Sequence, residues 1–175
     1  MVTLRAELLA CVALGQSVAI DFIDTSLWDA LHRIHEIYGV FCHFPDVELG
    51  KAATKNTMRV TKSIRDLPLS SALDELLTPF KLDWYITEYA TVNVITAEEA
   101  SARRDLRVFP IVELTEAGHG ADQLVKKITE TIEPKSWQAA GGTATIRALP
   151  GVLIVRHNRR THERIAKLLE SLAGK

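Results

Sequence analysis

A helix followed by a strand is written twice in the first half of this 175-residue chain. The first copy reads SLWDALHRIHEIYGVFCHF (26–44), and the second, 42 positions later, reads PLSSALDELLTPFKLDWYI (68–86). The matched pairs are Asp24 with Asp66, Leu27 with Leu69, Ala30 with Ala72, Leu31 with Leu73, Ile34 with Leu76, Tyr38 with Phe80, and Val40 with Leu82. Each strand–helix–strand unit is too small to bury its own apolar side, so two units predict a sheet with both helices on one face.

Apolar spacing predicts the elements of this first region, because a helix face recurs every three or four residues and a half-buried strand alternates. Val18, Ile20 and Phe22 alternate as in a strand. Thr25 or Ser26 can cap the helix that follows, and Gly39 suits the position after its end. The expected elements are strands at 17–22, 40–44 and 57–64, helices at 27–38 and 69–80 with Pro68 in the first turn of the second, a loop at 45–56, and a hairpin of 81–86 with 91–96.

The second half of the chain predicts the order β-α-β-β-α. Pro150 and Gly151 form a strong turn signal between two apolar runs. Asn158 or Thr161 can cap a closing amphipathic helix. The expected elements are strands at 106–114, 143–149 and 151–157, and helices at 118–133 and 158–172.

We therefore predict an α+β protein of two small domains, residues 1–98 and 106–175, joined by a charged linker at 99–105. The 47% hydrophobic content is enough for a core in each. The residues expected in the first core are Leu27, Leu31, Leu69, Leu73, Leu76 and Trp84, and those expected in the second are Val125, Ile128, Trp137, Ile154 and Leu168.

Charge and cysteine content exclude several classes of protein. A net charge of −1 argues against a chain that coats nucleic acid or an anionic membrane. Residues 1–16 are interpreted as an amphipathic helix, because Glu7 interrupts the apolar run that a secretory signal needs. No run approaches the roughly 18 apolar residues of a membrane span. Cys11 and Cys42 are interpreted as small apolar residues, and the sequence leaves open whether they pair.

Two regions of the chain carry a resemblance to a known family. VAIDFIDTSLWDALHRIHEIYGV and MRVTKSIRDLPLSSALDELLTPFKLDWYITEYATVNVIT, within residues 17–98, resemble the short N-terminal (STN) domain of secretins and TonB-dependent receptors. TIEPKSWQAAGGTATIRALPGVLIVRHNRRTHERIAKLLESL, within residues 106–173, resembles the KH-like β-α-β-β-α modules that follow in secretins. The shared pattern is one of apolar positions and covers nearly the whole chain.

The resemblance implies a non-enzymatic module of the bacterial cell envelope that binds protein partners or other copies of itself, as part of a secretion or transport assembly. It implies a periplasmic location, no cofactor and no catalytic residue, whereas the residues alone leave a cytoplasmic location open. Exposed sheet edges such as TVNVI (91–95) are expected to support such pairing. Neither secretin pore formation nor a receptor barrel is implied by these residues.

The sequence gives less support to catalysis, metal binding or nucleic-acid binding. There is no G-x-S-x-G or H-E-x-x-H motif. The pairs His32 with His35 and His157 with His162 do not supply the three or four converging ligands that zinc needs, so no metal site is predicted. The alternative function is nucleic-acid binding by a KH-like module, although the G-x-x-G loop of KH domains is missing. The candidate phosphate contacts for that alternative are Arg156, Arg159, Arg160 and Arg164.

Overall fold

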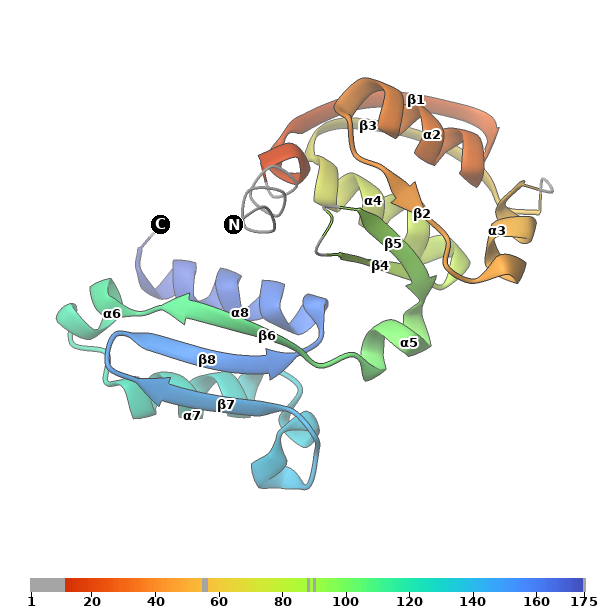
Figure 1. The fold of residues 1–175 in the computed structure, drawn as a ribbon. Helices are drawn as coiled ribbons and strands as arrows, with labels where there is room; N and C mark the ends of the chain where they lie inside the picture. The colour runs from red at the N-terminus through yellow and green to blue at the C-terminus, as the bar shows by residue number, and fades with distance from the viewer. Residues whose placement is uncertain (1–11, 55–56, 88, 90, 175) are drawn as a thin grey trace. The chain divides into compact units, whose positions relative to one another are not determined.

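The computed structural model describes residues 12–54, 57–87, 89 and 91–174, and the chain divides into two compact units, Met1–Ala100 and Ser101–Lys175 (Figure 1). Both units mix helices with small sheets, which confirms the predicted α+β class. Most of the predicted helix at 1–16, including Cys11, lies outside the described residues. Helix α5 (Ala97–Ala102) contains the point at which the two units divide.

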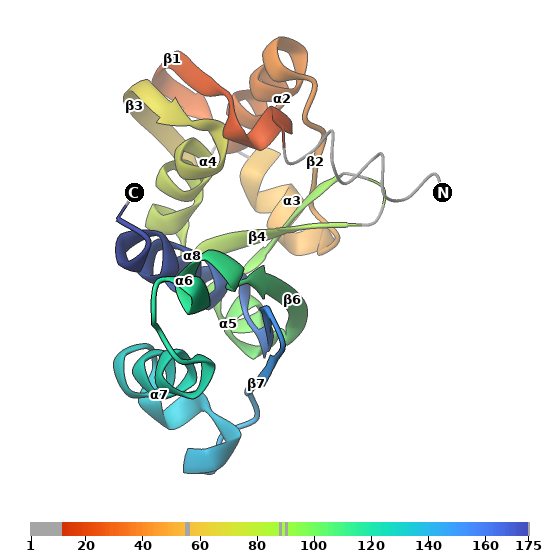
Figure 2. The same cartoon turned by 90° about the vertical axis from the view of Figure 1, so that its left-hand side faces the viewer.

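The first unit contains two sheets, whereas the sequence predicted one. Strands β1 (Ser17–Ser26) and β3 (Arg59–Pro68) pair antiparallel and run side by side as a long ribbon (Figures 1 and 2). The second sheet has the order β2-β5-β4. Its strands are β2 (Cys42–His43), β4 (Leu82–Ile86) and β5 (Val92–Thr96). The predicted hairpin is confirmed as β4 and β5. Strand β2 is only the central part of the strand predicted at 40–44.

The β1–β3 ribbon shows that the sequence repeat is also a structural repeat. Ser17 pairs with Pro68, and Ser26 pairs with Arg59. Adding 42 to one member of each pair gives the other pair's partner (17 + 42 = 59 and 26 + 42 = 68), so a local twofold axis relates the copies. The backbone repeats as well, because Asp24 and Asp66 both have positive φ, at 45° and 55°. The same holds at the helix ends, where Gly39 and Lys81 have φ of 71° and 57°.

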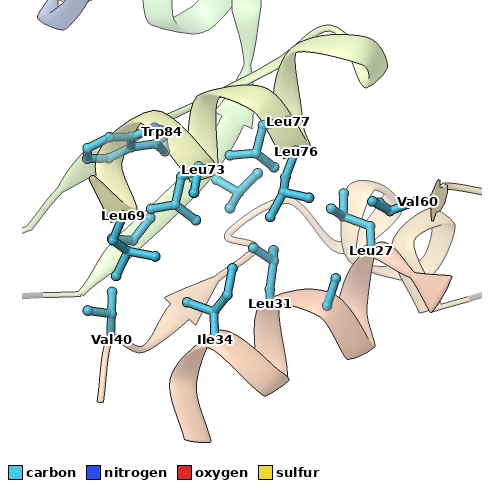
Figure 3. Packing of buried hydrophobic residues seen from close by; sticks show 14 of the residues in the cluster. Leu27, Leu31, Ile34, Val40, Val60, Leu69, Leu73, Leu76, Leu77 and Trp84 are labelled. Atoms are coloured by element: carbon cyan, nitrogen blue, oxygen red, sulfur yellow. The ribbon is translucent and has the colours of Figure 1, made fainter. Parts of the chain in front are cut away.

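Two helices close the first core between them. Helix α2 (Leu27–Tyr38) begins after Ser26, whose Oγ accepts a hydrogen bond from the Asp29 N–H at 3.1 Å. Helix α4 (Leu69–Leu77) begins after Pro68, which therefore precedes the first turn and does not lie in it, and a 3₁₀ turn follows at Thr78–Phe80. The leucines of the two helices point toward one another (Figure 3). All six residues predicted for this core are buried: Leu27, Leu31, Leu69, Leu73, Leu76 and Trp84.

The loop predicted at 45–56 is wrong, because a helix, α3 (Val47–Thr54), forms there. Asp46 caps it: its Oδ1 accepts from the Leu49 N–H at 2.8 Å, and its carbonyl accepts from the Gly50 N–H at 3.0 Å. The Leu, Lys, Glu and Ala residues of VELGKAAT are strong helix formers. Pro45, Asp46 and Gly50 resemble turn signals in sequence, but the first two stand before the helix, where they favour its start.

The second unit has the predicted β-α-β-β-α order with one extra helix. Strand β6 (Asp105–Pro110) ends four residues before the strand end predicted at residue 114. Helix α6 (Val112–Glu116) forms in the last part of the predicted strand and just beyond it. Helix α7 (Ala121–Thr131), two 3₁₀ turns (Pro134–Ser136 and Gln138–Ala140), strands β7 (Thr145–Leu149) and β8 (Val152–His157), and helix α8 (Arg159–Leu172) follow. The sheet order is β6-β8-β7, with both pairs antiparallel.

Trp137 closes one end of the second core. Its side chain is buried, and its indole N–H donates to the Ile132 carbonyl at 2.8 Å. The chain turns back tightly beside it, where a Cβ on Gly142 would lie 1.9 Å from the Ser136 carbonyl oxygen. Only glycine fits that approach without a backbone shift. Of the predicted second-core residues, Ile128 and Trp137 are buried, and Val125 and Leu168 pack half-buried against the core.

Candidate interaction surfaces

The sheet of the second unit has one face inside the core and one face outside. Phe109, Leu153 and Val155 point inward, against the core residues of α7 and α8. Because neighbouring residues along a strand point to opposite faces, the next residues point outward. We call these residues the outer sheet face: Leu106, Val108 and Pro110 of β6, Val152, Ile154 and Arg156 of β8, and Thr145, Arg147 and Leu149 of β7.

The outer sheet face is largely apolar and lies open. Leu106, Val108 and Leu149 have exposed fractions of 66%, 50% and 50%. Cross-strand neighbours on this face are Val108, Ile154 and Arg147, so an apolar row ends in a basic residue. The prediction that Ile154 belongs to the core is wrong, because the register of β8 turns it to the outer face. Adjoining exposed apolar side chains of this kind mark contact surfaces.

A shallow hollow lies beside α2 in the first unit. It encloses about 350 Å³ including its open mouth, and its lining is Trp28, Leu31, His32, His35, Phe41, Cys42 and Phe44. Trp28 stacks on Phe44 with ring centroids 6.0 Å apart. Phe41 meets His35 edge to face at 5.5 Å. Trp28 and Phe41 are nevertheless 43% and 53% exposed. The hollow therefore presents aromatic surface to solvent.

Polar groups of the hollow are few. The Nδ1 atom of His35 is buried and has no hydrogen-bond partner among the described residues. His32 Nε2 lies 3.6 Å from a carboxylate oxygen of Glu36, and both side chains are largely exposed. Burial raises the pKa of the Cys42 thiol to about 12, so the thiol is protonated at neutral pH. A protonated thiol is neither a strong nucleophile nor a metal ligand.

Two histidines that the sequence left unassigned belong to the interior of the second unit. His157 Nδ1 accepts from the Asn158 N–H at 2.9 Å, so its Nε2–H donates to Ser136 Oγ at 2.8 Å. His162 packs against Phe109 with ring centroids 6.0 Å apart. Burial, and then the nearby Arg107, lowers the pKa of His162 to about 4. Both rings are structural, and no group of three or more potential metal ligands occurs among the described residues.

The predicted nucleic-acid contacts are only partly brought together. Arg156 lies at the end of β8 and donates to the Arg104 carbonyl at 3.1 Å. Arg159 forms an ion pair with Glu163 one turn along α8, and Arg164 faces Glu133 at 3.4 Å. Carboxylates therefore lie beside two of the four candidate guanidinium groups. Arg160 is exposed on the first turn of α8.

We expect a 20-nucleotide RNA not to be retained by this chain in filter binding, even at about 50 mM salt, where phosphate contacts are strongest. Binding should be weak because Arg159 and Arg164 already form ion pairs with Glu163 and Glu133. The net charge of −1 also gives the chain no overall attraction for phosphates. Binding whose affinity falls steeply with salt, and falls further in Arg156→Ala/Arg160→Ala, would contradict this expectation and support the alternative function.

The sheet edge predicted at TVNVI is wrong. Strand β5 is the central strand of its sheet, bonded to β2 on one side and β4 on the other. The open edges of the described sheet are β2 and β4. Strand β2 runs parallel to β5, with Cys42 opposite Val92, and Cys42 also lines the hollow.

Comparison with known proteins gives matches only among solved structures, since no family model and no curated protein matches the chain. It is similar to a chain of the GspC–GspD complex of the type II secretion system from enterotoxigenic Escherichia coli, at 14% identity and a TM-score of 0.32, over 91% of this chain and 100% of that one. The N-terminal domain of the secretin XcpQ from Pseudomonas aeruginosa matches at 16% identity and a TM-score of 0.30, over 91% of this chain and 65% of that one.

A chain of the Salmonella SPI-1 injectisome structure that includes InvG N0N1 matches at 13% identity and a TM-score of 0.35, over 91% of this chain and 96% of that one. Of the XcpQ chain described above, this chain covers 65%, which is just under two thirds. Likenesses at these scores assign no function. Among the described residues, no helix is both long and apolar enough to cross a membrane.

Proposed function

We propose that this chain is a non-enzymatic protein–protein interaction and assembly module of the bacterial cell envelope, working in a secretin-like secretion or transport system. The observation that carries the proposal is the outer sheet face, on which Leu106, Val108 and Leu149 are at least half exposed. Apolar surface of this kind is stabilised when another protein removes it from water.

The order of elements supports the same function. The first unit repeats strand–helix–strand about a local twofold axis, and the second follows as β-α-β-β-α. This is the order expected of an STN-like domain followed by a secretin N-type module. The finer assignment, an STN-like domain at 1–98 and a KH-like module at 106–175 joined at 99–105, is part of the proposal. A periplasmic location is proposed on the same resemblance.

Sedimentation velocity over a hundredfold range of protein concentration tests the assembly. We expect the sedimentation coefficient to rise with concentration, because copies associate through apolar surface. Val108→Lys places an ammonium group in the apolar row that Val108 and Ile154 form on the outer sheet face, where its desolvation opposes contact. The association constant of this variant is expected to fall at least about tenfold, which corresponds to about 1.4 kcal/mol.

Gln123→Lys is the matched control, since it adds the same charge to an exposed position of α7. Its association should equal that of the unchanged chain. A monomer at every concentration that also captures no envelope protein would remove the proposed function. Equal association of the two lysine variants would remove the outer sheet face as its basis.

A further inference from the structure

The two copies of the repeat fill the same place in different ways. Position 42 of the first copy corresponds to position 84 of the second (42 + 42 = 84), so Cys42 stands where the second copy has Trp84. By the same shift, His32 stands where the second copy has Asp74 (32 + 42 = 74). Cys42 and Trp84 lie on β2 and β4, the two strands that flank β5.

In the second copy the place is filled. Trp84 is 3% exposed and lies against α4 (Figure 3). Its indole N–H donates to Asp74 Oδ1 at 2.9 Å. The second copy thus shows which side chain fits between this helix and this strand, and which polar group on the helix holds it.

In the first copy the corresponding place is the hollow. Cys42 is a small side chain where Trp84 is a large one, and it lines the hollow together with Leu31 and His35. Trp28 stands where the second copy has Ser70 (28 + 42 = 70), yet its ring stacks on Phe44 and stays 43% exposed. The large side chain of the first copy therefore borders the hollow without being enclosed as Trp84 is.

The polar groups at the hollow define the chemistry of an occupant. No carboxylate belongs to its lining among the described residues, whereas His32 and His35 do. The unpartnered Nδ1 of His35 leaves a buried polar atom of the lining unsatisfied, which is unfavourable in the free protein. Glu36, outside the lining, already lies beside His32, so the imidazole of His35 is the group that complements an acidic group on the occupant. Strand β2 at the rim has an open edge in the described sheet, which suits an extended chain.

We propose that the hollow receives a tryptophan side chain carried next to an acidic residue in an extended segment of a partner protein, in the way that the second copy receives its own Trp84. This inference rests on the proposed interaction function and names a surface for it. The hollow belongs to the first unit, whereas the outer sheet face belongs to the second.

The probe is the blocked peptide acetyl-Val-Asp-Trp-Val-amide, titrated into the full chain and followed by ¹H–¹⁵N NMR. We expect saturable shifts at the indole N–H of Trp28 and the amides of β2, with a dissociation constant on the order of 1 mM, typical of so small a ligand. Acetyl-Val-Asp-Leu-Val-amide and acetyl-Val-Lys-Trp-Val-amide are the matched controls and should bind at least about fivefold more weakly.

Two substitutions give the first copy the tryptophan and the aspartate that form the Trp84–Asp74 hydrogen bond in the second copy. Cys42→Trp should fill the hollow from within, abolish the response to the Trp peptide, and raise the melting temperature of the first unit by about 3 °C. Adding His32→Asp supplies the acceptor that Asp74 provides in the second copy, so the double variant should melt higher than Cys42→Trp alone. If Cys42→Trp does not fold, Phe41→Ala at an exposed rim position should weaken the peptide at least about fivefold.

The outcomes separate this inference from the proposed function. Absence of any shift at 10 mM peptide, or a response that Cys42→Trp and Phe41→Ala both leave unchanged, overturns the inference. Equal binding of the leucine peptide overturns it too, because the site would then not select an indole. Each of these results can occur while the chain still self-associates in sedimentation, and in that case the proposed function stands. If the peptide binds to a chain that never self-associates and captures no partner, the inference about the hollow is supported and the proposed assembly function is rejected.

Discussion

Trp137→Ala is expected to lower the free energy of unfolding of the second unit by about 3–5 kcal/mol, the range for truncating a fully buried large aromatic side chain. The loss has two sources. The indole fills the end of the core and meets His157 at 5.0 Å between ring centroids. Its N–H is also the hydrogen-bond donor to the Ile132 carbonyl. Urea unfolding followed by far-UV circular dichroism measures the change without using the deleted fluorophore.

Leu106→Ala is the control for this experiment, because Leu106 lies in the same unit and is 66% exposed. Its free energy of unfolding should stay within about 0.5 kcal/mol of the unchanged chain. A loss below about 1 kcal/mol for Trp137→Ala would show that Trp137 does not close the second core.

Acidification from pH 6.5 to pH 4 is expected to destabilise the second unit by about 3 kcal/mol through His162. Its pKa is lowered from 6.5 to about 4 in the folded chain, so the unfolded state binds the proton more tightly. The stability that the neutral ring contributes is fully present above pH 6.5 and is lost as the pH falls toward 4. The size follows from about 2.5 pH units at 1.36 kcal/mol each. His157, whose pKa burial also lowers, acts in the same direction.

His162→Gln removes the titrating group while keeping a side chain that can donate to the Val155 backbone, with which the ring is hydrogen-bonded. Urea denaturation at half-unit steps from pH 7 to pH 4 compares the two chains. The variant should lose less stability over this range, by about the 3 kcal/mol assigned to His162. Parallel pH profiles for the two chains would show that His162 is not buried as a neutral ring.

Most of the fold could be predicted from the sequence, because short-range patterns govern it. The cap at Ser26, the reversal at Gly39 and the leucine stripe of 69–77 each act within a few residues, so spacing alone predicted α2 and α4. Trp137 was expected in the second core, and it is buried there. The repeat at an offset of 42 was also visible in the sequence, and the register of β1 with β3 gives it a physical meaning.

The errors lie where an element depends on partners far along the chain. A strand that alternates does not reveal which face is covered, so Ile154 was placed in the core although the register with β6 and β7 turns it outward. Strand β5 was expected at a sheet edge, but β2, about 50 residues earlier in the chain, pairs with its other side. The helix α3 was missed because Pro45, Asp46 and Gly50 are common in turns and at helix starts alike.

The candidate sites were not visible in the sequence for a related reason. The spacing of arginines predicted candidate phosphate contacts within residues 156–164. The hollow in the first unit depends instead on Cys42, which was interpreted only as a small apolar residue. Its significance appears only when β2 and β4 are seen to flank the same strand and Cys42 is compared with Trp84.

The sequence by itself determined the class of the fold, the two repeated helices, and the order of the other elements apart from α3 and α6, since capping and apolar periodicity act between neighbours in the chain. The tertiary structure decided how the strands pair, which sheet face stays open, and where a small side chain leaves a hollow. Those features depend on contacts between residues separated by tens of positions, and no local pattern encodes which side chain will lie opposite another.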